Sequence, residues 1–156
     1  MRTVSSFSRR QSHMSTKSRR RRGQALVEMA LVLTLLLSIV MGIVEFGWLV
    51  TRTYAVGNAT REGARYASLG RTTADIKTRV AQTGSSSFIT PSNITLEYYE
   101  STTSRWLPMT DAGANNAVPT GYQTRVTVTI PHQPLTGFFP FLKRNITQFT
   151  VMRREL

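Results

Sequence analysis

The feature that most constrains this chain is an apolar stretch over residues 25–50, which reads ALVEMALVLTLLLSIVMGIVEFGWLV. Sixteen consecutive uncharged residues separate Glu28 from Glu45. The 22 residues that follow Glu28 up to position 50 form a helix about 33 Å long, enough to span a hydrocarbon core of about 30 Å. A soluble chain of 156 residues can hardly cover a helix that is apolar on every side. We therefore predict one transmembrane helix over residues 24–50, with the lipid bilayer as its partner.

A basic leader precedes this helix. Residues 1–23 carry eight Lys or Arg and no acid, and without them the net charge falls from +12 to +4. Four consecutive arginines stand directly before the apolar stretch: Arg19, Arg20, Arg21 and Arg22. By the positive-inside rule they predict a cytoplasmic N-terminus. The Ser- and Arg-rich composition predicts disorder, and Met14 offers an alternative start to Met1.

The helical pattern continues beyond the membrane. Residues 51–68 contain no proline and carry a small residue at every fourth position. These small residues are Ala55, Ala59, Gly63 and Ala67. On a helix they form one stripe that lets a neighbouring backbone approach closely, as in small-xxx-small packing. We expect one helix over about 25–68, with residues 51–70 as its extracytoplasmic extension and Gly70 as its cap.

The hydrophobic period changes to two in the C-terminal half. Apolar residues alternate with polar ones over 94–98 and 125–130, and 146–152 is a third β-rich run. A short helix is predicted over 75–82. An antiparallel sheet with one apolar face needs a cover, and the outer half of the long helix is available for this. The predicted fold class is α+β, with a long N-terminal transmembrane helix that continues into a small antiparallel β-sheet domain over residues 71–156.

The head of the apolar helix carries a motif, Gly23-Gln24-Ala25-Leu26-Val27-Glu28. A carboxylate costs about 2.5–3.5 kcal/mol near a membrane centre and less near an interface, so Glu28 needs a reason. The pattern GxxxxE after a basic leader resembles the processing site of type IV prepilins. More specifically, GQALVEMALVLTLLLSIVMGIVEFG followed by ATREGARYAS resembles the TadE-like pseudopilins of tight-adherence (Tad or Flp) pilus systems.

The resemblance extends more weakly to VTVTIPHQPLTGFF and ITQFTVMRR near the C-terminus. It implies a pilin-like fold, cleavage between Gly23 and Gln24 by a prepilin peptidase, and a role of Glu28 in assembly. Cleavage would free the α-amine of Gln24, whose pKa is about 7.7–8.0, and this cation can pair with Glu28 of a neighbouring subunit. Met29 departs from the Phe or Tyr usual in pilins. The alternative is that Gly23 is a linker and Glu28 lies among lipid headgroups.

Other charged residues lie farther along the helix. Glu45 is about 26 Å beyond Glu28, near the outer interface, where Arg52 or headgroup water is its expected partner and a subunit contact is the alternative. Aromatic residues around it are typical of an interfacial belt: Phe46, Trp48 and Tyr54. The group Arg61, Glu62 and Arg65 is predicted to contact the sheet or another subunit, since exposed pairs on a helix contribute only a few tenths of a kcal/mol.

The sequence offers no site of catalysis. It contains no nucleotide-binding glycine motif, no HExxH, no nucleophile elbow and no cysteine, and its two histidines, His13 and His132, are interpreted as solvated or turn residues. We predict no enzyme activity, no cofactor and no metal. Nucleic acid is not an expected partner, because the arginine run is explained by topology and has no aromatic platform beside it.

The predicted function is that of a minor pseudopilin or assembly factor of a tight-adherence (Flp/type IVc) pilus or related secretion system. Its partners are a prepilin peptidase, other pilus or pseudopilin subunits and the assembly platform. The expected location is the cytoplasmic (inner) membrane of a bacterium, single-pass, with the C-terminal domain outside, or the pilus or cell surface. One alternative is an unprocessed single-pass anchored binding module. A secreted domain cut near residues 55–57 is disfavoured, because the apolar stretch exceeds an ordinary signal peptide.

Overall fold

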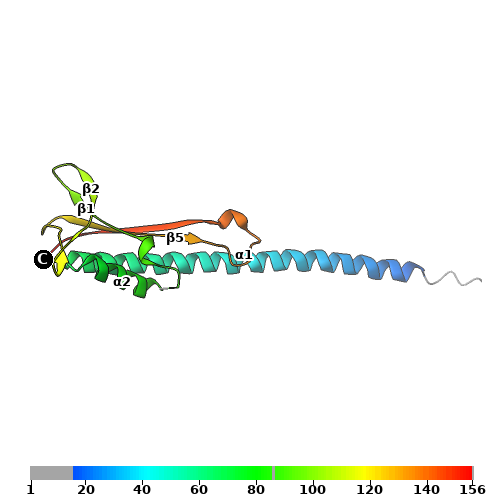
Figure 1. Cartoon of the computed structure of the whole chain (residues 1–156). Coiled ribbons are helices and arrows are strands. Elements are labelled where there is room, and N and C mark those ends of the chain that lie inside the picture. The colour runs from blue at the N-terminus through cyan, green and yellow to red at the C-terminus, as the bar shows by residue number, and fades with distance from the viewer. Residues whose placement is uncertain (1–15, 86, 156) are drawn as a thin grey trace, which may run out of the picture. The chain divides into compact units, whose positions relative to one another are not determined.

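The first helix is longer than the sequence predicted. The computed structural model describes residues 16–85 and 87–155 and divides into two compact units, residues 1–41 and 42–156. Helix α1 (Thr16–Ser68) runs without interruption through the apolar stretch (Figure 1). The prediction of a disordered leader is therefore wrong for residues 16–23, because Lys and Arg are good helix formers and an existing helix propagates at little cost. Residues 1–15 lie outside the described residues.

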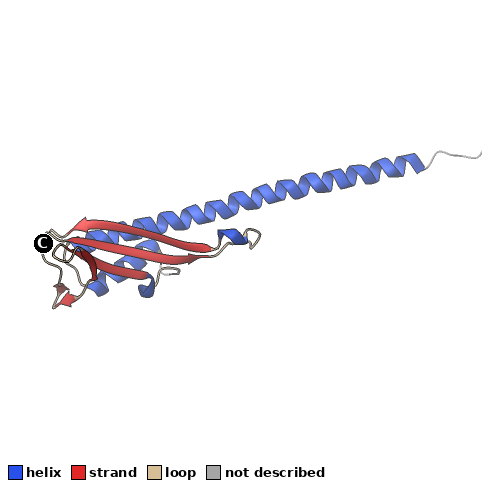
Figure 2. Cartoon of the chain, turned by 90° about the horizontal axis from the view of Figure 1, so that it is seen from above, coloured by secondary structure: helices blue, strands red, loops and turns tan. Residues whose placement is uncertain are grey.

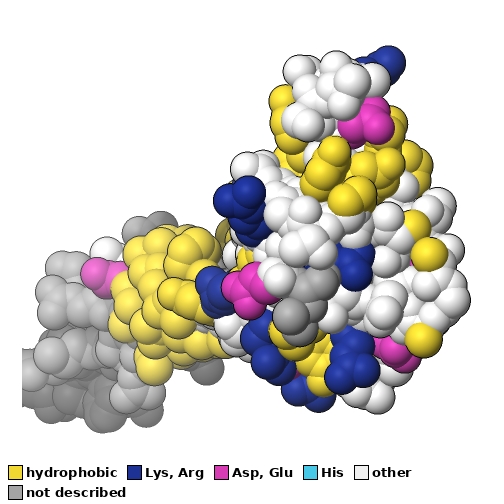
Figure 3. All heavy atoms as spheres, turned by 90° about the vertical axis from the view of Figure 1, so that its left-hand side faces the viewer, with side chains coloured by type: hydrophobic (Ala, Val, Ile, Leu, Met, Phe, Trp, Pro, Cys, Tyr) yellow, Lys and Arg dark blue, Asp and Glu magenta, His cyan; other side chains and the backbone are white. Residues whose placement is uncertain are grey.

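Most of the apolar stretch of α1 is uncovered by the rest of the chain. Apart from the partly buried Met41, its large apolar side chains between Leu26 and Val44 are 44% to 69% exposed. Figure 3 shows these hydrophobic side chains gathered over the surface of the helix. Within the described residues, α1 is the one helix long and apolar enough to cross a membrane. This exposure fits a helix whose surroundings are lipid rather than protein.

The later turns of α1 begin the sheet domain, by which we mean residues 42–155. Helix α1 ends at Ser68 and is capped as predicted by Gly70, whose φ of 76° is left-handed, with Arg71 N donating to Tyr66 O at 3.2 Å. Helix α2 (Thr73–Gly84) follows and contains the predicted segment 75–82. Its N-cap is Thr72, whose hydroxyl accepts a bond from Asp75 N at 3.2 Å.

A four-stranded antiparallel sheet forms the other layer of the domain (Figure 2). Its order is β2 (Arg105–Pro108), β1 (Ile94–Glu100), β5 (Gln123–His132) and β6 (Arg144–Arg153). The three predicted strands are thus found as β1, β5 and β6, and the α+β prediction is confirmed. Several short elements were not predicted, since short segments carry little periodicity. They are strand β2, a small ladder of β3 (Asp111–Ala112) with β4 (Asn115–Asn116), and the short helices η1 (Pro91–Asn93) and η2 (Pro140–Leu142).

The core lies between the sheet, α2 and the later turns of α1. On β5 the alternating residues Val126, Val128 and Ile130 are fully buried, as the period of two requires. A Cβ atom placed on Gly63 would lie 2.3 Å from Val80 Cγ2 on α2 and 3.2 Å from Val126 Cγ1 on β5. Helix α1 therefore touches both neighbours at Gly63, and only a residue without a side chain fits there.

The small-residue stripe packs inside its own domain. Ala59, Gly63 and Ala67 are buried, and Ala55 is partly buried. The close approach that the stripe permits is thus used by α2 and the sheet of the same chain.

Gly63→Ala is expected to lower the free energy of unfolding of the full chain in detergent by about 1–3 kcal/mol, because the added methyl overpacks against a β-branched side chain. Gly57→Ala on the same helix is the matched control: its Cβ would meet its nearest neighbour, Arg61 Nη2, at 4.0 Å. That change is expected to stabilise the helix by up to about 1 kcal/mol. Chemical unfolding followed by near-ultraviolet circular dichroism measures both, and equal midpoints would contradict the packing at Gly63.

Candidate functional site

The head of α1 carries residues that packing within the chain does not explain. Gly23, Gln24 and Glu28 are all exposed helix residues. A Cβ placed on Gly23 would meet nothing within 4 Å, although a helical glycine costs about 1 kcal/mol relative to alanine. Among residues whose side chains the structure describes, 23–85 and 87–155, Glu28 has no hydrogen bond or ion pair. The arginine side chains of residues 19–22 lie outside that part.

Glu45 is the most buried charged residue of the described chain, with 0% of its surface exposed. Its Oε1 accepts a bond from Leu135 N at 2.6 Å, and its Oε2 accepts bonds from Thr136 N at 3.1 Å and Thr136 Oγ1 at 2.9 Å. The interpretation that Arg52 or headgroup water is its partner is therefore wrong. The donors belong to the segment after β5, whose backbone N–H groups have left the sheet ladder and need an acceptor.

His132 also differs from its interpretation as a solvated or turn residue. It ends β5, is 1% exposed, and pairs in register with Arg144 on β6. Strand β5 passes through Pro131 because pairing with β1 stops at Val128, which leaves one side of the strand free there.

The surroundings of His132 favour its neutral form. Burial lowers the pKa of the imidazole, Arg52 and Arg144 lower it further, and Glu45 opposes them. The Arg52 guanidinium in turn lies over the Phe88 ring at 4.8 Å. Three polar side chains thus lie near one another at this end of the sheet domain: Glu45 and Arg52 from α1 and His132 from β5.

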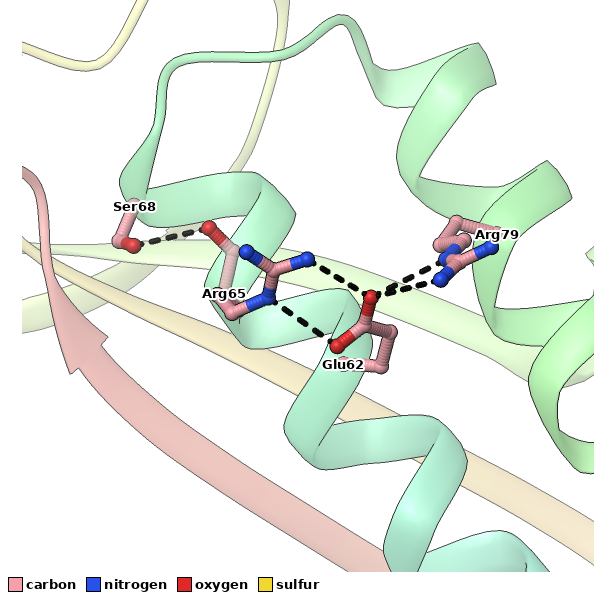
Figure 4. A network of polar contacts seen from close by, with 4 residues as sticks. All are labelled: Glu62, Arg65, Ser68 and Arg79. Carbon is pink, nitrogen blue, oxygen red and sulfur yellow. Dashed lines mark hydrogen bonds and ion pairs between the residues drawn. The ribbon is translucent and has the colours of Figure 1, made fainter.

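A second charged cluster joins α1 to α2 (Figure 4). Glu62 accepts from Arg65 Nε and Nη2 at 3.1 and 3.0 Å, and from Arg79 Nε and Nη2 at 3.1 and 3.0 Å. These hydrogen bonds lower the pKa of Glu62 to about 2. Arg61 instead donates to Asn58 Oδ1 at 2.6 Å. In the described chain Glu62 therefore contacts α2, while Arg61 and Arg65 stay exposed.

Within residues 16–85 and 87–155 no group of three or more His, Cys, Asp or Glu side chains could hold a metal ion. Glu45 and Glu62 instead tie α1 to the β5–β6 segment and to α2, while Glu28 lies exposed at the head of α1.

Comparison with known proteins adds one finding. The profile of the family described as TadE-like protein matches residues 23–65, which include the head motif, the apolar stretch and three residues of the small-residue stripe, Ala55, Ala59 and Gly63. No curated protein and no solved structure matches the chain.

The Glu62 cluster predicts a pH-dependent stability. A carboxylate with a folded pKa of about 2 and an unfolded value of about 4.3 stabilises the fold above the unfolded value, and this is lost as pH falls through about 2. Because Arg65 and Arg79 are 55% and 41% exposed, Glu62→Gln is expected to cost only about 1 kcal/mol at pH 7.

The measurement is chemical unfolding of both chains from pH 7 to pH 2, and the difference between them should shrink below about pH 4.3. Glu100→Gln is the control, because Glu100 has no arginine partner among the described residues. A difference that stays constant across the pH range would contradict the role of the Glu62 ion pairs.

Proposed function

We propose that this chain, which is TadE-like over residues 23–65, acts as a minor pseudopilin or assembly factor of a tight-adherence (Flp/type IVc) pilus or a related secretion system. A TadE-like segment and an apolar helix able to span a bilayer fit a membrane protein associated with a Tad pilus. The observation that carries the proposal is the head of α1, where an open glycine precedes by five residues an exposed glutamate that has no partner among residues 23–85 and 87–155.

The orientation in this proposal has the N-terminus in the cytoplasm and the sheet domain outside the cytoplasmic membrane of a bacterium. The arginines before residue 23 support it, because basic residues are retained on the cytoplasmic side. The acids Glu45 and Glu62 are compatible with this orientation, since both carboxylates accept hydrogen bonds from groups of the sheet domain. The chain then crosses the membrane once.

Cleavage after Gly23 by a prepilin peptidase is the second part of the proposal. The bond between Gly23 and Gln24 lies inside α1, whereas a protease needs local access to an unwound backbone. Glycine weakens the helix by about 1 kcal/mol and leaves its surface open, so it favours local unwinding at this position. A helix otherwise rich in good helix formers would resist the peptidase.

Assembly through Glu28 is the third part. The new α-amine of Gln24 is a cation at neutral pH and can pair with Glu28 of a neighbouring subunit. In the apolar surroundings of a helix bundle such a pair satisfies two charges that lipid would leave unsatisfied. Since Ala59, Gly63 and Ala67 are packed inside the domain, the mostly exposed stretch 26–44 is the part of α1 that we assign to contacts with other pseudopilin subunits and the assembly platform.

The test of processing is the N-terminus and intact mass of the membrane-extracted chain, from cells with and without the cognate prepilin peptidase. The mature chain should begin at Gln24 only when the peptidase is present. Gly23→Leu should retain the leader, while Gly47→Leu, at a helical glycine with equally open surroundings, should still be cut.

Retention of the leader by the unchanged chain in both strains would instead favour an unprocessed membrane-anchored binding module. A start near residues 55–57 would favour ordinary secretion.

Glu28→Gln is expected to leave insertion and cleavage intact but to reduce co-purification with partner pilus subunits on the order of tenfold. The reason is the loss of one charge-assisted hydrogen bond, typically about 1.5–3 kcal/mol. Glu100→Gln on the sheet domain serves as the control for a surface carboxylate. Unchanged recovery of the Glu28→Gln chain with its partners would refute a role of this residue in assembly.

A further inference from the structure

The segment between β5 and β6, residues 133–143, presents an unusual set of side chains; we name it the β5–β6 loop. Leu135, Phe138 and Phe141 are 61%, 74% and 76% exposed. Among described residues after α1, the other exposed large apolar side chains are Phe149 and Val151. Three of these five therefore lie within seven residues of one loop.

The loop is held against α1 at one position along the helix, near Gly42 and Glu45. Glu45 accepts three hydrogen bonds from the backbone and hydroxyl groups of Leu135 and Thr136. Phe139 Cζ lies 3.8 Å from a Cβ placed on Gly42, and the Phe139 ring packs edge-on against Phe141 at 5.8 Å. These contacts fall where the uncharged run of residues 29–44 meets Glu45, toward the outer end of the predicted transmembrane helix.

The charges around the loop suit an interface with lipid. Lys143 and Arg144 come two and three residues after Phe141 and are exposed. The sequence has no acid between Asp111 and Glu155, and the nearby Glu45 carboxylate is fully buried beneath the loop's own N–H groups. On α1, Phe46 and Trp48 lie beside Glu45 and are 63% and 39% exposed. Aromatic rings with adjacent basic residues are typical of membrane–water interfaces.

We propose that the β5–β6 loop is a second membrane contact of this chain. Leu135, Phe138 and Phe141 enter the interfacial region of the bilayer leaflet at the Glu45 end of the apolar stretch, while Lys143 and Arg144 bind lipid phosphates. Glu45 is the positioning residue, because it ties the loop to the helix and leaves no free carboxylate at the membrane surface. The inference rests on α1 spanning the bilayer and is independent of leader cleavage.

The chain has no cysteine, so single cysteines report on single positions. Phe138→Cys and Phe141→Cys are labelled with a fluorescent nitrobenzoxadiazole probe in the full chain and reconstituted into phosphatidylethanolamine–phosphatidylglycerol vesicles. Quenching is measured with nitroxide-bearing lipids and with aqueous iodide. Phe149→Cys, an aromatic position 64% exposed on β6, is the matched control, and Leu37→Cys reports the spanning helix.

Both loop labels should be quenched by lipid nitroxide severalfold more than the Phe149 label and be less accessible to iodide. Loop labels that behave like the Phe149 label, while the Leu37 label is quenched by lipid, would overturn the loop contact and leave the spanning helix intact. Loop labels that are shielded from iodide but not quenched by lipid nitroxide would overturn the loop contact. They would indicate instead that a second copy of the chain covers the loop. A Leu37 label that lipid does not quench would overturn the spanning helix and the loop contact together.

Discussion

The close packing of α1 at Gly63 is the contact on which the sheet domain depends. At this point one helix meets Val80 of α2 and Val126 of β5, so two layers of the domain converge on a residue without a side chain. Small residues one turn away on either side keep the backbones close. The same helix then has two different surfaces: small and buried in its later turns, large and exposed between residues 26 and 44.

Two carboxylates at different positions along α1, those of Glu45 and Glu62, bind other parts of the sheet domain. Near the end of the apolar stretch, the Glu45 carboxylate supplies acceptors for a loop that has left the sheet ladder. About five turns later, Glu62 links α1 to Arg79 on α2. Both acids have specific donors, so neither leaves an unsatisfied charge. Of the three acids on α1, Glu28 has no such donor among residues 23–85 and 87–155, and this distinction is the basis of the proposed assembly role.

Sequence reasoning reached the main elements because their signals are local. Three sequence patterns each specify an element without reference to the rest of the chain. They are the apolar stretch, the repeat of small residues every four positions at Ala59, Gly63 and Ala67, and the alternation of apolar and polar residues along β5. Sequence reasoning failed at the start of α1, because a Ser- and Arg-rich composition predicts disorder where residues 16–23 are helical. It also missed β2, whose four residues gain their regularity from pairing with β1 rather than from their own pattern.

A long apolar helix with a basic N-terminal flank, a TadE-like head motif and an α+β chain can all be inferred from the amino-acid sequence, because periodicity and composition act over neighbouring residues. The partners of the buried polar groups can be identified only in the folded chain. Glu45 finds its donors 90 residues away at Leu135 and 91 residues away at Thr136, and His132 is buried where a turn was expected. Such partners depend on the path of a loop after the sheet has formed, and that path has no signature in the residues next to Glu45.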